Sequence, residues 1–283
     1  MTTTSNAAIR VSVSRFSAPR VRALAALARR DFLIQRSYRL AFALDLLFGV
    51  IDVGVYYFIS RTFSSAPTAA LGGAPDYFGF ALVGIALTVV IQAATTGLAF
   101  RIREEQLTGT LEAMVMQPLS TAELALGLCG LPFLFATARV VFYLVVATTL
   151  FGLHFPDADW TGLALLLVVT GLAMSAIGIA SGAIVLVVKR GNSLAGLILF
   201  GMSVVGGAFF PVSVLPSWLE AIGKAVPTRF AYDGLRAALY RGSGWTDDLL
   251  VLVLFSAIGV PAAVWLFDRG IEMTRRVGSL AQY

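Results

Sequence analysis

Six long apolar runs constrain the fold of this chain more than any other feature of its sequence. They cover residues 40–60, 78–100, 124–152, 161–188, 194–212 and 248–267. A helix of about 20 apolar residues crosses the roughly 30 Å hydrocarbon core of a bilayer. Each run is near or above that length, so the sequence predicts an all-α membrane protein with six transmembrane helices.

The composition agrees with this class. Of the 283 residues, 58% are hydrophobic and 13% are charged, whereas soluble domains carry about 25% charged residues. The net charge of +5 would also fit a nucleic-acid-binding protein, but the basic residues lie at the ends of the apolar runs and not on a soluble basic surface. The sequence therefore excludes a soluble fold, and we expect no nucleic acid partner.

The distribution of basic residues predicts the orientation of the chain. With the N-terminus inside, fifteen of the 21 Lys and Arg residues fall on the cytoplasmic side. The positive-inside rule therefore places both termini in the cytoplasm, in agreement with an even number of spans. The first forty residues have no short apolar core followed by a small-residue cleavage site, so we expect the N-terminus to be retained.

These observations divide the chain into three parts. Residues 1–39 form a cytoplasmic N-terminal tail, residues 40–267 the six-helix transmembrane domain, and residues 268–283 a cytoplasmic C-terminal tail. Within the first part, arginines and apolar residues alternate at helical spacing over residues 19–38, as in an interfacial helix on the inner membrane surface. A plain basic topology signal explains the same residues, and both interpretations stay open.

The cytoplasmic segment between the second and third runs is too polar to lie in lipid. Its sequence over residues 101–121 is RIREEQLTGTLEAMVMQPLST. The pattern predicts a short helix that begins after Gly109 and Thr110 and ends at Pro118. One face of this helix would carry Leu111, Met114 and Val115. A short amphipathic helix on the cytoplasmic side suits docking into a groove on a partner protein.

A second non-spanning segment, residues 211–247, lies on the outer side in this topology. Pro216 and Pro227 each precede a short helical pattern, and Thr228 is placed to cap the second helix. Neither helix is long enough to cross a bilayer, so we expect the pair to lie in the outer interface or to dip back into the bundle. A lid or exit rim is the functional interpretation, and an ordinary interfacial loop is the alternative.

Three charged residues lie inside the predicted spans. Asp45 and Asp52 share one face of the first span, and Arg139 lies in the third. An unpaired charge at the bilayer centre costs about 2.5–3.5 kcal/mol, so these side chains should face protein or water. Asp52 and Arg139 fall at similar depth, and we predict that they pair, either to hold the two spans together or at the border of a substrate path. Asp45 is shallower.

Other kinds of site find little support in the sequence. The single Cys129 and the single His154 exclude an internal disulfide and a Cys/His metal site within one chain. The sequence has no G-x-x-x-x-G-K-[ST] phosphate loop. We therefore expect no catalytic residue, no metal and no cofactor on this chain.

The two non-spanning segments and the order of the six runs resemble the permease subunits of type-2 ABC exporters. The likeness extends over nearly the whole chain, and the stretches that carry it are REEQLTGTLE (103–112), QPLS (117–120), FFPVSVLPSWL (209–219) and PTRFAYDGLR (227–236).

The resemblance implies a coupling helix within residues 101–121, seated on a nucleotide-binding subunit, and a pair of outer re-entrant helices within residues 213–241. The residues that would couple to the ATPase are Glu104, Glu105, Gly109, Thr110, Leu111, Glu112, Met114, Val115, Gln117 and Pro118. The residues that would mark the re-entrant helices are Phe210, Pro211, Pro216, Trp218, Leu219, Pro227, Phe230 and Arg236.

The resemblance also implies a function. The chain would be the membrane-spanning subunit of an ATP-driven exporter in the cytoplasmic membrane of a bacterium, in contact with membrane lipids. Two permease chains, as a homodimer or a related heterodimer, would assemble with two copies of an ABC ATPase subunit that binds ATP and Mg²⁺. The missing phosphate loop agrees with a separate ATPase. An apolar interior suits a lipid-like or hydrophobic/amphipathic substrate, such as a drug or a glycolipid.

Two other function classes were weighed. A proton- or ion-coupled secondary transporter would use Asp45, Asp52 and Arg139, but no inverted repeat is visible between the two halves of the chain. A membrane-embedded enzyme would need paired carboxylates, a Ser/Lys dyad or a His cluster at a sensible depth, and none is evident in the sequence. Co-purification with an ATPase would distinguish a permease of an ABC exporter from a secondary transporter and from a membrane-embedded enzyme.

Overall fold

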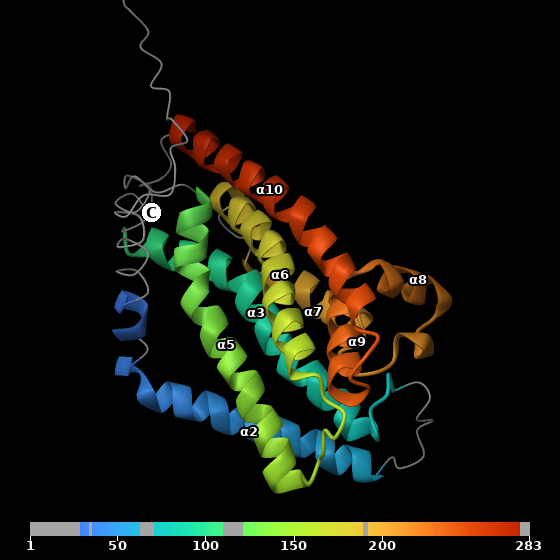
Figure 1. The fold of residues 1–283 in the computed structure, drawn as a ribbon. Coiled ribbons are helices and arrows are strands. Elements are labelled where there is room, and N and C mark those ends of the chain that lie inside the picture. Colours follow the sequence, from blue (N-terminus) through green and yellow to red (C-terminus); the bar gives the residue numbers. More distant parts are fainter. Residues whose placement is uncertain (1–28, 34–35, 63–70, 110–120, 189–191, 278–283) are drawn as a thin grey trace, which may run out of the picture.

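A computed structural model describes residues 29–33, 36–62, 71–109, 121–188 and 192–277. Over these residues the regular structure is helical throughout (Figure 1). In the described part of the chain, five helices are long and apolar enough to cross a membrane. They are α2 (Arg39–Thr62), α3 (Tyr77–Leu107), α5 (Thr121–Phe151), α6 (Trp160–Val188) and α10 (Thr246–Val277). These helices correspond to five of the six predicted runs.

The remaining run, residues 194–212, contains a shorter helix than predicted. Helix α7 (Asn192–Val205) has 14 residues and is about 21 Å long. The chain leaves the helix at Gly206 and Gly207, and Gly207 has a φ of +93°, a backbone conformation that favours glycine. A count of six spans and the orientation of the termini therefore stay predictions.

Three short helices follow α7 and gather at one end of the bundle (Figure 1). They are the 3₁₀ turn η2 (Val212–Val214), α8 (Ser217–Ala225) and α9 (Pro227–Tyr240). The helices that the two prolines predicted are therefore present. Pro216 directly precedes α8, and Pro227 is the first residue of α9, where its fixed φ suits a helix start and its missing N–H costs no bond.

The core of the fold lies between α3, α5, α6 and α9. Helix α6 packs along both α3 and α10, and α3 also packs on α5. The largest buried side chains of this core include Leu82, Leu87 and Ile91 of α3 and Leu166 and Met174 of α6. Helix α3 is therefore packed on two sides, by α5 and by α6.

One glycine sets the distance between α3 and α6. A Cβ atom on Gly178 of α6 would run into the backbone oxygen of Ala94 on α3. The two backbones can approach this closely only because residue 178 has no side chain, which is a common device in membrane helix packing.

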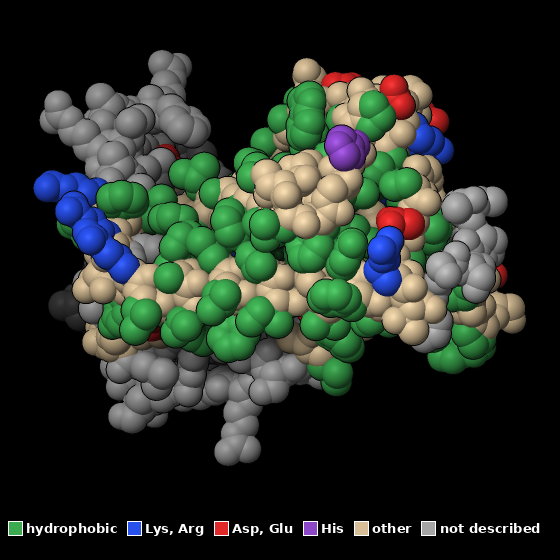
Figure 2. Space-filling model, turned by 90° about the horizontal axis from the view of Figure 1, so that it is seen from below, with side chains coloured by type: hydrophobic (Ala, Val, Ile, Leu, Met, Phe, Trp, Pro, Cys, Tyr) green, Lys and Arg blue, Asp and Glu red, His purple; other side chains and the backbone are tan. Residues whose placement is uncertain are grey.

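Helix α2 lies across the bundle and packs loosely on it (Figure 1). Only 6% of its apolar stretch is buried inside the chain, against 78% for α3. The large apolar side chains that α2 leaves exposed include Leu44, Leu47, Phe48, Ile51, Val55 and Phe58. Figure 2 looks onto the side of the molecule where α2 lies and shows mostly hydrophobic side chains, with few charges between them. Such a surface suits contact with lipid.

Candidate functional site

The end of α3 that the predicted topology places in the cytoplasm carries the first residues that were predicted to couple to an ATPase. Glu104 is exposed and Glu105 is buried near the end of this helix. The chain turns at Gly109, whose φ of +72° favours glycine, and the short helix predicted to begin after Thr110 lies outside the described residues. The other predicted coupling residues lie outside the described residues, and they are Thr110, Leu111, Glu112, Met114, Val115, Gln117 and Pro118.

Four charged side chains join the N-terminal helical segment, residues 29–33, to this end of α3. Arg30 Nη2 lies 2.8 Å from Glu105 Oε1 and 3.1 Å from Asp31 Oδ1. Arg101 Nη2 lies 3.4 Å from Asp31 Oδ2. Because Asp31 and Glu105 are both buried, the alternating charges neutralise one another where water is largely excluded. We call these four residues the cytoplasmic charge cluster, and it fastens the N-terminal segment to the helix that leads into residues 110–120.

The sequence identified only part of this cluster. Glu105 was predicted from the family resemblance, whereas Arg30, Asp31 and Arg101 were interpreted only as topology signals or tail residues. The available signal was Asp31, an acidic residue within an arginine-rich tail. Its second partner, Arg101, lies on a helix far along the chain, which no local pattern can identify.

The intramembrane charges pair differently from the prediction. Arg139 Nη2 donates a hydrogen bond to Asp45 Oδ2 at 2.7 Å, so the predicted pair between Asp52 and Arg139 is wrong. That prediction counted depth along parallel helices, whereas α2 crosses α5 obliquely (Figure 1). The Asp45 side chain is 58% exposed, so the pair is open on one side. No ion pair of Asp52 is found in the described part of the chain.

At the opposite end of the bundle, the side chain of Arg236 joins three elements. It is only 1% exposed, and its Nη2 donates to the backbone oxygens of Gly207 at 2.8 Å, Phe80 at 3.2 Å and Ala208 at 3.4 Å. Its guanidinium carbon lies 3.5 Å from the centre of the Phe80 ring. Burial lowers the pKa of Arg236 to about 10, still well above neutral pH, so the group stays charged. Arg236 therefore ties α9 to the start of α3 and to the turn after α7.

Two further hydrogen bonds hold α9 against α3. The Tyr232 hydroxyl lies 2.9 Å from Thr88 Oγ1, and the Tyr240 hydroxyl donates to the Gly79 backbone oxygen at 2.8 Å. Both tyrosines come from α9 and both partners from α3. The two helices are thus linked by specific polar bonds as well as by apolar packing.

Thr228 does not cap the second short helix, α9, as the sequence predicted. It is the second residue of α9, and no described side chain caps this helix. Its hydroxyl instead donates to the Met202 backbone oxygen of α7 at 2.8 Å. The helix begins two residues earlier than the capping interpretation assumed, because Pro227 already occupies the first helical position and Val226 is the N-cap.

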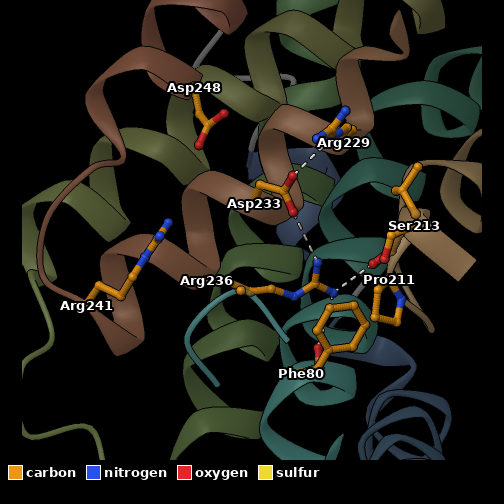
Figure 3. A pocket seen from close by; sticks show the side chains of 11 residues that line it. Phe80, Pro211, Ser213, Arg229, Asp233, Arg236, Arg241 and Asp248 are labelled. Carbon is orange, nitrogen blue, oxygen red and sulfur yellow. Dashed lines mark hydrogen bonds and ion pairs between the residues drawn. The ribbon is translucent and has the colours of Figure 1, made fainter. Parts of the chain in front are cut away.

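A polar cavity of about 380 Å³ opens beside Arg236, and we call it the outer cavity (Figure 3). Arg229 Nε and Arg236 Nη1 approach the Asp233 carboxylate to 3.2 Å and 3.6 Å. The lining of the outer cavity comes mainly from α3, the α7–α8 connection, α9 and the start of α10. The lining residues are Gly72, Phe80, Gly207, Pro211, Val212, Ser213, Arg229, Asp233, Arg236, Arg241 and Asp248.

The predicted re-entrant residues do not gather at one site. Pro211 and Arg236 line the outer cavity, whereas Trp218 is 65% exposed on α8. The other predicted residues of this set are partly buried or, for Pro216, exposed, and they are Phe210, Pro216, Leu219, Pro227 and Phe230. Sequence reasoning missed Arg229, Asp233, Arg241 and Asp248 as lining residues.

Long apolar helices and a paired set of short helices at one end define a polytopic helical membrane protein, and comparison with known proteins narrows this class. Residues 22–240 match the family model described as "ABC-2 type transporter". The chain belongs to this family, and it is thus a membrane permease subunit of an ABC transporter, for which the family implies an ABC ATPase partner.

Curated relatives point the same way. The "Inner membrane transport permease YadH" of Escherichia coli (strain K12) is 23% identical over 189 residues, which cover 66% of this chain and 72% of the relative. The protein of the same name from Shigella flexneri matches with the same identity and coverage. The chain is a multi-pass protein of the cytoplasmic membrane.

Proposed function

We propose that this chain is the permease of an ABC exporter that moves a lipid-like or hydrophobic/amphipathic compound, such as a drug or a glycolipid, out across the cytoplasmic membrane. Two permease chains, identical or related, would share two copies of an ATPase subunit that binds ATP and Mg²⁺. The observation that carries the proposal is the course of α3, which reaches from the cytoplasmic charge cluster to the helices at the opposite end.

Helix α3 supports transmission of force between the two ends. It has 31 residues and is about 46 Å long. Glu105 belongs to the cytoplasmic charge cluster near one end, and Phe80 contacts Arg236 near the other. A continuous helix that is packed on both sides behaves as a stiff element. A displacement of residues 101–121 by the ATPase would therefore reach α9.

An apolar groove supports a hydrophobic substrate. A hollow of about 200 Å³ lies between α3, α5 and α6, and only one of its lining side chains is polar. The lining residues are Ala94, Gly130, Phe133, Val168, Gly171, Leu172 and Ser175. A groove with so few hydrogen-bonding groups favours an acyl chain or an aromatic drug over a sugar chain.

The experiment that tests the proposal is reconstitution of the permease with the ABC ATPase that co-purifies with it. Lipids, glycolipids and amphipathic drugs are added to the vesicles, and ATP hydrolysis and outward movement are measured. We expect a hydrophobic or amphipathic compound to stimulate hydrolysis and to be moved only when ATP is present. Transport driven by a proton gradient without ATP, or a permease that brings down no ATPase, would refute the proposal.

A further inference from the structure

The outer cavity contains charges that neither the coupling path nor the apolar groove uses. Three arginines and two aspartates line it, so its formal net charge is +1. A closed structural cluster would be expected to pair these charges with one another, because an unmatched charge beside buried surface is costly. The pairing is only partial.

One part of the lining is already engaged. Arg229 and Arg236 both approach the Asp233 carboxylate, and the Arg236 Nη2 atom bonds to backbone oxygens. The Arg236 Nε atom, however, is buried without a hydrogen-bond partner. The wall of the cavity thus keeps positive character and an unused donor.

The other part of the lining is open. Arg241 follows α9, Asp248 lies in the first turn of α10, and both side chains line the cavity (Figure 3). In the described part of the chain, neither residue forms an ion pair. A cation and an anion without partners, on one rim of a polar cavity, match a ligand that carries both charges.

We propose that the outer cavity binds the headgroup of a zwitterionic aminophospholipid. Its phosphate would lie against the guanidinium groups of Arg241 and Arg229, and its primary ammonium against the Asp248 carboxylate. Paired charges of this kind form short, charge-assisted hydrogen bonds. The volume of about 380 Å³ lies within the usual range of pockets that hold small ligands, about 300–1,000 Å³.

The surroundings of the cavity favour a lipid over a free aminophosphate. Val214, Trp218 and Ile222 are exposed on η2 and α8, next to the cavity-lining residues of the α7–α8 connection. An amphipathic helix with an exposed Trp settles at the interface between headgroups and acyl chains. The headgroup of a neighbouring lipid would then be at the level of the cavity.

The proposal is independent of transport, because binding can be measured on the full-length permease without its ATPase. Lipids retained by the purified protein are quantified by native mass spectrometry after titration with phosphatidylethanolamine or phosphatidylglycerol. The first lipid carries a phosphate and a primary amine, and the second a phosphate alone. We expect the wild-type protein to prefer phosphatidylethanolamine about tenfold, as one charge-assisted bond to the amine would provide.

Three variants assign the preference to the cavity. Asp248→Asn should bring the two lipids to equal binding, since it removes the partner of the amine. Arg241→Gln should weaken both lipids about tenfold. Lys224→Gln is the matched control, because it removes an exposed cation of α8 that does not line the cavity, and it should leave both affinities unchanged. Size-exclusion profiles and melting curves establish that each variant is folded.

Three outcomes would overturn the assignment. Equal binding of the two lipids by the wild-type protein would show that the amine is not recognised. An unchanged preference in Asp248→Asn would place any lipid site elsewhere. Displacement of phosphatidylethanolamine by soluble phosphoethanolamine at a similar concentration would show a site for the free compound and not for a lipid. None of these results bears on ATP-driven export, which the reconstitution tests separately.

Discussion

Replacement of Arg236 by Met tests how firmly α9 is held to the rest of the fold. Methionine is also unbranched and fills part of the same space, but it donates no hydrogen bond. The variant leaves the Gly207 and Phe80 backbone oxygens, which now accept bonds of 2.8 Å and 3.2 Å, without this donor. Each buried acceptor that loses its partner costs about 1–3 kcal/mol. Counting these two bonds and neglecting the longer one to Ala208, we expect a loss of about 2–6 kcal/mol.

This loss is large enough to measure as a shift in melting temperature. For a chain of this size, 1 kcal/mol corresponds to about 2–4 °C, so the Arg236→Met protein should melt about 4–24 °C below the wild type in detergent. Arg236→Lys should fall in between, because an ammonium is a compact donor that cannot reproduce the planar fork of a guanidinium. Differential scanning fluorimetry on the purified full-length chain provides the measurement.

The matched control for this prediction is Lys224→Met. Lys224 forms an exposed ion pair with Glu220 on α8, and such pairs contribute about 0–1 kcal/mol. The control should therefore melt within about 3 °C of the wild type. If Arg236→Met melted as high as this control, the bonds from Arg236 to the α7 turn and α3 would not stabilise the fold, and the reasoning would be refuted.

Two further predictions follow from helix contacts. Reversing one charge of the cytoplasmic charge cluster, as Arg30→Glu or Glu105→Arg, should reduce substrate-stimulated ATPase activity of the reconstituted complex at least about fivefold, since removing an opposite charge from a buried group costs about 1–3 kcal/mol. The double reversal should recover most of this activity, and a double variant no better than either single one would contradict the pairing. Gly178→Ala should lower the melting temperature by several degrees because its Cβ meets the Ala94 oxygen, whereas Gly201→Ala, with open space at its Cβ, should melt no lower than wild type in the same assay.

The sequence predicted the long helices well, because hydropathy and length determine them almost alone. It failed to end α7 at Val205, since Gly206 and Gly207 lie inside an apolar run and hydropathy does not register a turn. The two prolines, in contrast, located the starts of α8 and α9, because proline acts on the backbone directly. The sequence thus predicted helix starts that proline determines locally, but it did not predict where the chain turns within an apolar run.

For the charged residues as well, the sequence predicted local features but not the tertiary contacts. The sequence identified Asp45 and Arg139 as charges that need a partner, and the structure pairs them. It chose Asp52 and not Asp45 as the partner of Arg139, because depth counted along parallel helices does not include the angle at which α2 crosses α5. The outer cavity was missed for a related reason: Asp248 is twelve residues beyond Arg236, and only the packing of α10 against α9 brings both to the same cavity.

Because α2 packs loosely on the rest of the protein, the bilayer can influence the orientation of this helix directly. With 24 residues, α2 is about 36 Å long, somewhat longer than the roughly 30 Å hydrocarbon core. A helix that few protein contacts restrain adjusts its tilt to membrane thickness, while the more deeply buried α3 and α6 would resist the same change. Thinner or thicker membranes would therefore act first on the bond between Asp45 and Arg139, so the lipid environment could adjust the junction of α2 and α5 without disturbing the core.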